Sequence, residues 1–79
     1  MKVKFFAHLQ TFTRCEETDI AAPRELSQDE IWAELEKKFP GISSYKSPTR
    51  LARNFTYAAP DSIFREGDEV ALLPPVSGG

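Results

Sequence analysis

Apolar and polar residues alternate near the N-terminus, which predicts that the chain opens with a β-strand. The strand is expected over residues 2–9, and its core face is formed by alternate residues: Val3, Phe5, Ala7 and Leu9. Its other face carries His8, lysines and one large aromatic side chain, Phe6. Residues 13–17 are polar and predict the connection of a hairpin, and residues 18–21 predict a short returning strand.

A helix with a defined start is expected next. Ser27-Gln28-Asp29-Glu30 has the form of a capping box, in which a serine and a glutamate three residues later each bond the other's backbone amide. Beyond it, apolar side chains recur at four-residue spacing and form one buried face with a neighbouring tryptophan: Ile31, Leu35, Phe39 and Trp32. Pro40-Gly41 is expected to end the helix.

The segment that follows, 42–50, is polar and predicts a loop or a short irregular helix. Residues 51–57 then predict a single strand with three larger side chains on one face: Arg53, Phe55 and Tyr57. Two turns are expected after it, with an apolar pair between them that fills the core: 59–62, Ile63-Phe64 and 65–68.

The last residues begin as a strand and continue as a tail. Val70 and Leu72 alternate with their neighbours in 69–73, which is the pattern of a pleated strand. Pro74 and Pro75 lack the backbone N–H that a sheet ladder needs, and they favour the stiff polyproline II conformation. We therefore expect the tail to be directed away from the sheet.

The sequence ends in Gly78-Gly79. Because glycine lacks a Cβ atom, these residues fit a channel that is too narrow for any other residue. The carboxylate of Gly79 is ionised at neutral pH and needs activation, for example as an acyl-adenylate, before acyl chemistry. The tail therefore indicates a carrier on which other proteins act. A frayed terminus is the alternative interpretation of the two glycines alone.

Composition narrows the class of protein. The chain has 79 residues, of which 41% are hydrophobic and 28% charged, as expected of one globular domain. A net charge of −2 with mixed signs offers no basic surface for nucleic acid. We see no apolar run long enough to span a membrane and no secretory leader. One cysteine fits a reducing compartment, so we expect a cytoplasmic protein.

An internal catalytic or metal site is not expected. His8 is expected on the outward face of the first strand, and Cys15 in a polar turn without a base partner. Proton transfer by His8 and a persulfide on Cys15 are the alternatives. No residues have the spacing of metal ligands, and the isolated glycines form no phosphate-binding loop, so we expect no bound cofactor and no metal.

The chain resembles the small, sulfur-carrier subunit of molybdopterin synthase in its final segments, Glu66-Gly67-Asp68-Glu69-Val70-Ala71 and Leu73-Pro74-Pro75-Val76-Ser77-Gly78-Gly79. Residues 2–9 are similar to the first strand of that family, and the helix start and Asn54 also fit. The Pro-Pro-Val-Ser-Gly-Gly ending is the specific part of the resemblance. The chain departs from the family at Arg53, where a small apolar residue is preferred, and in the turn over 13–17, which lacks a glycine.

The order of the expected elements alone indicates an α+β protein. The resemblance implies the ubiquitin-like β-grasp, in which a mixed sheet wraps one main helix and the last strand lies centrally, parallel to the first. Residues 1–73 would form this domain, and residues 74–79 would form a flexible, extended C-terminal tail.

The resemblance also implies a sulfur carrier for molybdenum cofactor biosynthesis that is not catalytic alone. An E1-like adenylyltransferase would use ATP to adenylate Gly79, and a sulfurtransferase or desulfurase would convert the adenylate into a thiocarboxylate. The large synthase subunit, in a heterotetramer with this chain, would supply catalytic groups and pass the sulfur to cyclic pyranopterin monophosphate. Gly78 would allow the tail to enter, and its reach and direction would be set by Pro74, Pro75, Val76 and Ser77.

A binding face is indicated on the side of the sheet away from the helix. Phe6, Tyr57 and Leu73 are its candidates, with Ala71 between them. Exposed aromatic and aliphatic side chains on a flat sheet are typical of a protein interface. The resemblance implies that this face and the tail dock into the large subunit. Burial of one or two of these side chains by local loops is the alternative.

Three other functions fit the same residues. The chain is then a sulfur carrier for another pathway such as thiamine synthesis, a ubiquitin-like modifier joined to lysines, or a non-catalytic β-grasp interaction module with an inert tail. Loss of function on tail truncation excludes the interaction module. The protein that co-purifies with the chain separates the two carriers from the modifier.

Overall fold

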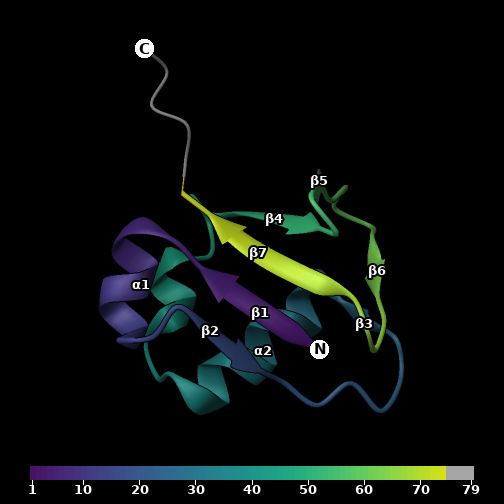
Figure 1. Ribbon diagram of the computed structural model, residues 1–79, viewed down its shortest axis with the longest axis horizontal. Helices are drawn as coiled ribbons and strands as arrows, with labels where there is room; N and C mark the ends of the chain where they lie inside the picture. The colour runs from purple at the N-terminus through teal and green to yellow at the C-terminus, as the bar shows by residue number, and fades with distance from the viewer. Residues whose placement is uncertain (75–79) are drawn as a thin grey trace.

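The computed structural model describes residues 1–74, and a five-stranded mixed sheet forms its framework (Figure 1). The strands, in their spatial order, are β2 (Glu17–Asp19), β1 (Lys2–Phe5), β7 (Glu69–Leu73), β4 (Arg50–Arg53) and β5 (Thr56–Tyr57). β7 is parallel to β1, and the other neighbouring strands are antiparallel. The last strand therefore lies in the centre of the sheet beside the first, as predicted.

Helix α2 (Gln28–Lys38) covers one face of the sheet, behind β1 and β7 in Figure 1. Its predicted capping box is confirmed: the Glu30 amide donates to Ser27 Oγ at 3.2 Å, and the Ser27 amide donates to Glu30 Oε1 at 2.9 Å. The helix ends before Pro40, and Gly41 has a positive φ of 98°. A short 3-10 helix, η1 (Ile42–Tyr45), follows, so the prediction of a short irregular helix is also confirmed.

The core lies between the sheet and α2. Its fully buried large side chains come from the central strands and from the segments packed on them: Phe5, Phe64, Leu9, Ile31, Leu35, Ile42, Leu72, Val3 and Val70. The alternation predicted for the last strand is confirmed, because Val70 and Leu72 are buried while their neighbours are not. A separate two-stranded ladder joins β3 (Leu26–Ser27) to β6 (Ile63–Phe64). Phe64 fills the core as predicted, but Ile63 is 40% exposed.

The prediction of a first strand over 2–9 was wrong beyond Phe5. A helix, α1 (Ala7–Thr13), follows β1 and carries Leu9 into the core from a helical position. Phe5 and Leu9 are four residues apart, a spacing that alternation and helical periodicity both satisfy. Ala7 is therefore not a strand residue on the core face; it begins α1 with a positive φ of 53° and is exposed.

The polar connection expected over 13–17 is shorter and joins different elements: α1 ends at Thr13, β2 begins at Glu17, and residues 14–16 link this helix, rather than a first strand, to the returning strand. Arg14 ends the helix in the left-handed conformation with φ of 61°, a position at which helices usually place glycine. Its amide donates to the Gln10 carbonyl at 2.9 Å. The returning strand β2 starts at Glu17, one residue before the expected segment.

The prediction of one strand over 51–57 was also wrong, because the segment is a hairpin. Arg53 pairs with Thr56, which leaves a two-residue turn of Asn54 and Phe55 between β4 and β5. Both turn residues have positive φ, 50° and 72°, as a type I′ turn requires. The usual signal for this turn is Asn-Gly, and a phenylalanine in place of the glycine concealed it.

Within residues 1–74, no helix combines the length and the apolar character that a membrane span requires.

Candidate functional site

The root of the tail is fixed by the centre of the sheet. β7 is paired on both sides, with β1 and with β4, and the side chain of its residue Leu72 is fully buried in the core. Leu73 ends the strand opposite Arg50, and Pro74, which is half-buried, follows it. The predicted tail residues that come next lie outside the described part of the chain: Pro75, Val76, Ser77, Gly78 and Gly79.

We call the side of the sheet opposite α2 the outer face, and it faces the viewer in Figure 1. Strand register places one residue from each of four strands in a row across this face: Lys4, Ala71, Ala52 and Tyr57. Phe5 pairs with Leu72 on the core side, so the next residues of the two segments, Phe6 and Leu73, come together on the outer face.

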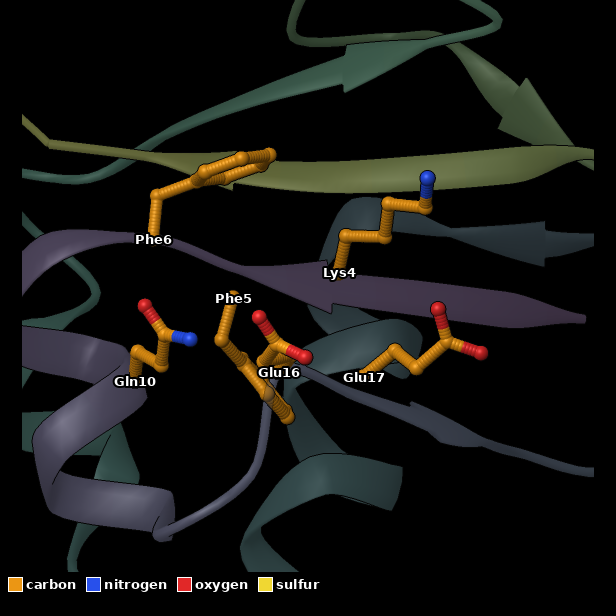
Figure 2. A pocket seen from close by; sticks show the side chains of 6 residues that line it. All are labelled: Lys4, Phe5, Phe6, Gln10, Glu16 and Glu17. Carbon is orange, nitrogen blue, oxygen red and sulfur yellow. The ribbon is translucent and has the colours of Figure 1, made fainter.

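A shallow groove crosses the outer face below the root of the tail. We call it the outer-face groove, and its lining residues are Lys4, Phe6, Ala52, Phe55, Glu69, Ala71 and Leu73. Figure 2 shows the Phe6 ring lying alongside β7 and the Lys4 side chain directed toward the same strand. Lys4 Nζ lies 3.5 Å from Glu69 Oε1, so the two charges of the groove are paired with each other. An apolar groove whose two charged side chains neutralise each other is suited to contact with another protein.

Three of the four sheet residues predicted for the binding face line this groove. Phe6 is 42% exposed, and Leu73 and Ala71 are half-buried, so loops do not cover them. Tyr57, which is 55% exposed, lies on the same face but outside the groove lining. Its ring lies under the Arg50 guanidinium at 4.8 Å, a cation–π contact next to the root of the tail.

Phe55 is the aromatic residue of the groove that sequence reasoning did not assign to this site. It was placed within a strand, whereas it lies at the tip of the β4–β5 hairpin and is 89% exposed. The available signal was Asn54, because asparagine tolerates the left-handed conformation that hairpin turns need.

A network of hydrogen bonds joins the hairpin turn to the start of β7. The Asn54 amide group donates to Asp68 Oδ1 at 3.1 Å and accepts from the Glu69 backbone N–H at 2.9 Å. The Arg65 backbone N–H donates to Asp68 Oδ2 at 2.8 Å. That bond, with smaller contributions from Asn54 and the charges of Arg53 and Arg65, holds the pKa of Asp68 below its ordinary value.

Arg53, the residue that departs from the resembled family, belongs to the same region. Its guanidinium donates to the Ile63 carbonyl at 2.8 Å and lies 3.4 Å from Asp68 Oδ2. It therefore ties the hairpin to β6 and to the turn before β7. The Arg53 charge is therefore paired within this chain, close to the hairpin that carries Phe55.

The two candidate reactive side chains lie away from this site. His8 is exposed on α1 rather than on a strand face, with its ring centroid 5.2 Å from that of Tyr45. Cys15 is half-buried after α1, next to a Thr13 hydroxyl that donates to its carbonyl at 3.0 Å. Among residues 1–74, no three His, Cys, Asp or Glu side chains are grouped as metal ligands.

A second depression lies between β1, α1 and β2, and Figure 2 shows the residues that line it: Lys4, Phe5, Phe6, Gln10, Glu16 and Glu17. Its polar groups are two carboxylates, an amide and an ammonium. None of these is a nucleophile paired with a base, so the depression offers no arrangement for catalysis.

Comparison with known proteins gives a consistent result. The model of the ThiS family matches residues 3–79. The chain is 35% identical to the molybdopterin synthase sulfur carrier subunit of Drosophila melanogaster, over 98% of this chain and 88% of that protein. The crystal structure of SAMP1 from Haloferax volcanii is similar with a TM-score of 0.85 and 26% identity, covering 100% of this chain and 98% of that one.

A third similarity is to a complex. Subunits 1 and 2 of the molybdopterin-converting factor from Helicobacter pylori have been solved together, and the matching chain is 28% identical. Its TM-score is 0.67, and the match covers 99% of this chain and 96% of that chain. The strand order and these structural similarities confirm the ubiquitin-like β-grasp that the resemblance implied.

Proposed function

The chain belongs to the ThiS family, and we propose that it is the sulfur-carrier subunit of a molybdopterin synthase. One observation carries the proposal: the family match runs through Gly79, and the tail that ends there starts from the central strand of the sheet. A centrally paired strand is a rigid support, so the position of Leu73, from which the tail starts, is fixed relative to the outer-face groove.

The chemistry that we propose takes place at the carboxylate of Gly79. A partner enzyme transfers AMP from ATP to this carboxylate and releases pyrophosphate. A sulfurtransferase then supplies a hydrosulfide equivalent that displaces AMP, which leaves a C–S bond in a C-terminal thiocarboxylate. Activation is needed because a carboxylate ionised at neutral pH is a poor acceptor for a nucleophile.

Sulfur donation follows from the same group. The thiocarboxylate sulfur attacks a carbon of cyclic pyranopterin monophosphate that bears an oxygen substituent. A C–S bond forms as the C–O bond at that carbon breaks and the oxygen departs with the bonding electrons, so that carrier and substrate are joined as a thioester. Water then cleaves the acyl–sulfur bond, which leaves sulfur on the substrate and restores the carboxylate of Gly79. Gly78 allows entry to a narrow channel because it has no side chain.

We propose that the large synthase subunit provides the catalytic groups and receives the tail. The solved complex of the two converting-factor subunits supports a large-subunit partner for this chain. The outer-face groove is the surface suited to it, because Phe6, Ala71 and Leu73 are exposed or half-buried beside the root of the tail.

A second candidate function is protein modification. It is favoured by the structural similarity to SAMP1. The name SAMP1 stands for small archaeal modifier protein 1, as the solved structure from Methanosarcina acetivorans spells out. The initial adenylation would be the same, and a lysine amine rather than sulfur would displace AMP. A sulfur carrier for another pathway differs only in the protein that accepts the sulfur.

The test is intact-mass spectrometry of the full chain after incubation with ATP, the activating enzyme and a sulfur donor. We expect the mass to rise by the difference between one sulfur and one oxygen, and we expect deletion of Gly79 to prevent this. Addition of the large subunit and cyclic pyranopterin monophosphate should then return the mass to its starting value. A Cys15→Ser variant is the matched control and should load sulfur normally.

Each other outcome points elsewhere. An unchanged mass with an active enzyme contradicts sulfur carriage, and sulfur that disappears in Cys15→Ser places it on the thiol. Covalent products with lysine-containing proteins, formed without sulfur, favour the modifier. Sulfur loading without transfer to the pterin favours a carrier for another pathway.

A further inference from the structure

Phe55 combines two features that are each unfavourable in a folded domain. Its side chain is 89% exposed, although a phenylalanine in water gives up the stabilisation that burial provides. Its backbone has φ of 72°, a left-handed conformation that is uncommon and strained for bulky residues. Nothing in residues 1–74 offsets either cost through packing of this ring, so a role outside the folded domain is indicated.

The position of Phe55 is nevertheless well defined. The neighbouring Asn54 backbone N–H donates to the Glu69 carbonyl at 2.8 Å, and the Asn54 side chain bonds both Glu69 and Asp68. On the other side of the turn, the Ala58 amide donates to the Leu51 carbonyl at 2.9 Å. The tip of the hairpin is therefore held against β7, and the ring is presented from a fixed backbone.

Phe55 also lines the outer-face groove, together with Phe6 and Leu73. Leu73 immediately precedes the tail, and the six residues from Pro74 to Gly79 reach roughly 20 Å at full extension. A partner that takes the carboxylate of Gly79 into its active site must therefore approach this end of the outer face closely. The groove and the Phe55 ring lie next to the surface that such a partner has to cover.

We propose that Phe55 is an aromatic anchor of this chain that inserts into an apolar pocket on the large synthase subunit. This inference rests on the proposed function and adds a residue and a partner feature to it. The groove supplies a largely neutral surface, because Lys4 and Glu69 are paired, and Phe55 supplies a large apolar side chain at its edge. Fixed aromatic side chains of this kind often contribute most of the affinity at protein interfaces.

The backbone of Phe55 allows a substitution that separates binding from folding. Phe55→Gly removes the ring and creates Asn-Gly, the preferred pair for a type I′ turn. We expect its thermal unfolding midpoint to be equal to or higher than that of the unaltered chain. We expect its dissociation constant for the large subunit, measured by calorimetry with both full-length proteins, to rise roughly tenfold or more. Phe55→Tyr keeps the ring and should bind within a few-fold of the unaltered chain.

Ile63→Ala provides the matched control. Ile63 is an exposed apolar residue of β6 that does not line the outer-face groove, so its truncation should leave the dissociation constant unchanged. Unaltered affinity of Phe55→Gly, or a loss of stability that accounts for weaker binding, overturns the inference and leaves the proposed function standing. Failure of the unaltered chain to bind the large subunit overturns both.

Discussion

At the scale of single residues, Glu30 shows how one side chain can serve two contacts. Its carboxylate accepts from the Ser27 amide within the capping box and lies 2.6 Å from an Arg24 guanidinium nitrogen. The hydrogen bond from Arg24, followed by the backbone bond from Ser27, lowers the pKa of Glu30 from 4.5 to about 2. Both contacts hold the start of α2 against the segment that leads into it.

The lowered pKa of Glu30 predicts a dependence of stability on acid. Its contribution is fully present above the ordinary pKa of a glutamate and is lost as the pH falls through about 2, because the folded state binds the proton less readily than the unfolded state. Glu30→Gln should therefore lower the unfolding midpoint at neutral pH, and the difference from the unaltered chain should shrink toward pH 2. Thermal denaturation followed by circular dichroism across this range measures it.

Glu34→Gln is the comparison for this prediction, because Glu34 lies on the same helix but outside the capping box, in an exposed pair with Lys37. A larger loss of stability for Glu34→Gln than for Glu30→Gln at neutral pH would contradict the assignment. So would a difference between Glu30→Gln and the unaltered chain that persists unchanged at pH 2.

At the scale of elements, the sequence predicted those whose ends carry chemical signals. The capping box fixed α2, and two prolines after an alternating segment fixed β7. Prediction from the sequence failed at α1, because the spacing of Phe5 and Leu9 fits both strand alternation and a helix. It also failed at the β4–β5 hairpin, because the turn has no glycine. Arg14, Asn54 and Phe55 all adopt positive φ without being glycine, and this is the information that residue type alone does not provide.

The candidate site followed the same pattern. Ala71 and Leu73 were predicted from the alternation of a strand that the sequence placed correctly. Phe6 lies just beyond β1, but its backbone is still extended, so the alternation also holds for it. Phe55 was missed because its location depends on a turn, and Tyr57 reached the predicted face by a different route. In the hairpin Tyr57 is paired with Ala52, which lies opposite Ala71. A single strand in the same register would have carried Tyr57 past Glu69, where β7 begins.

The bonds between the hairpin and β7 predict a second pH effect. In Asn54→Asp the new carboxylate replaces an amide that donates to Asp68 Oδ1, so two negative charges face each other across about the same 3.1 Å. Like charges raise the pKa of both carboxyls in the folded state, so the destabilisation is present at neutral pH and disappears as the pH falls below their pKa values. Aspartate tolerates positive φ, so the turn itself is kept.

Denaturant titrations of Asn54→Asp at neutral pH and near pH 3 measure this effect, with Asn54→Gly as the control. Asn54→Gly also removes the side-chain bonds, but it adds no charge, so its loss of stability should not recover in acid to the same degree. An equal loss of stability for Asn54→Asp at both pH values would mean that Asp68 is not close to residue 54 in solution.

At the scale of the whole molecule, the strand order joins stability to the proposed function. The first and last strands meet in the centre of the sheet, so the core is complete only when residues far apart in the sequence are paired. The same arrangement places the root of the tail beside the outer-face groove. The strand that closes the core is therefore also the strand that presents the tail, and the hairpin next to it presents Phe55.

This division predicts that stability and sulfur carriage can be removed separately. The ladder pairs of β7 and the buried core residues fall within residues 1–74, so a chain that ends at Pro74 should keep its free energy of unfolding to within about 0.5 kcal/mol. It should accept no sulfur, because the carboxylate of Gly79 is gone. Leu72→Ala should do the reverse: truncation of a fully buried side chain costs about 2–5 kcal/mol, while the folded fraction still loads sulfur.

Denaturant unfolding and intact-mass spectrometry on the same two proteins measure both effects. If the shortened chain proves as unstable as Leu72→Ala, residues 75–79 belong to the folded domain, and the division into residues 1–73 and 74–79 is wrong.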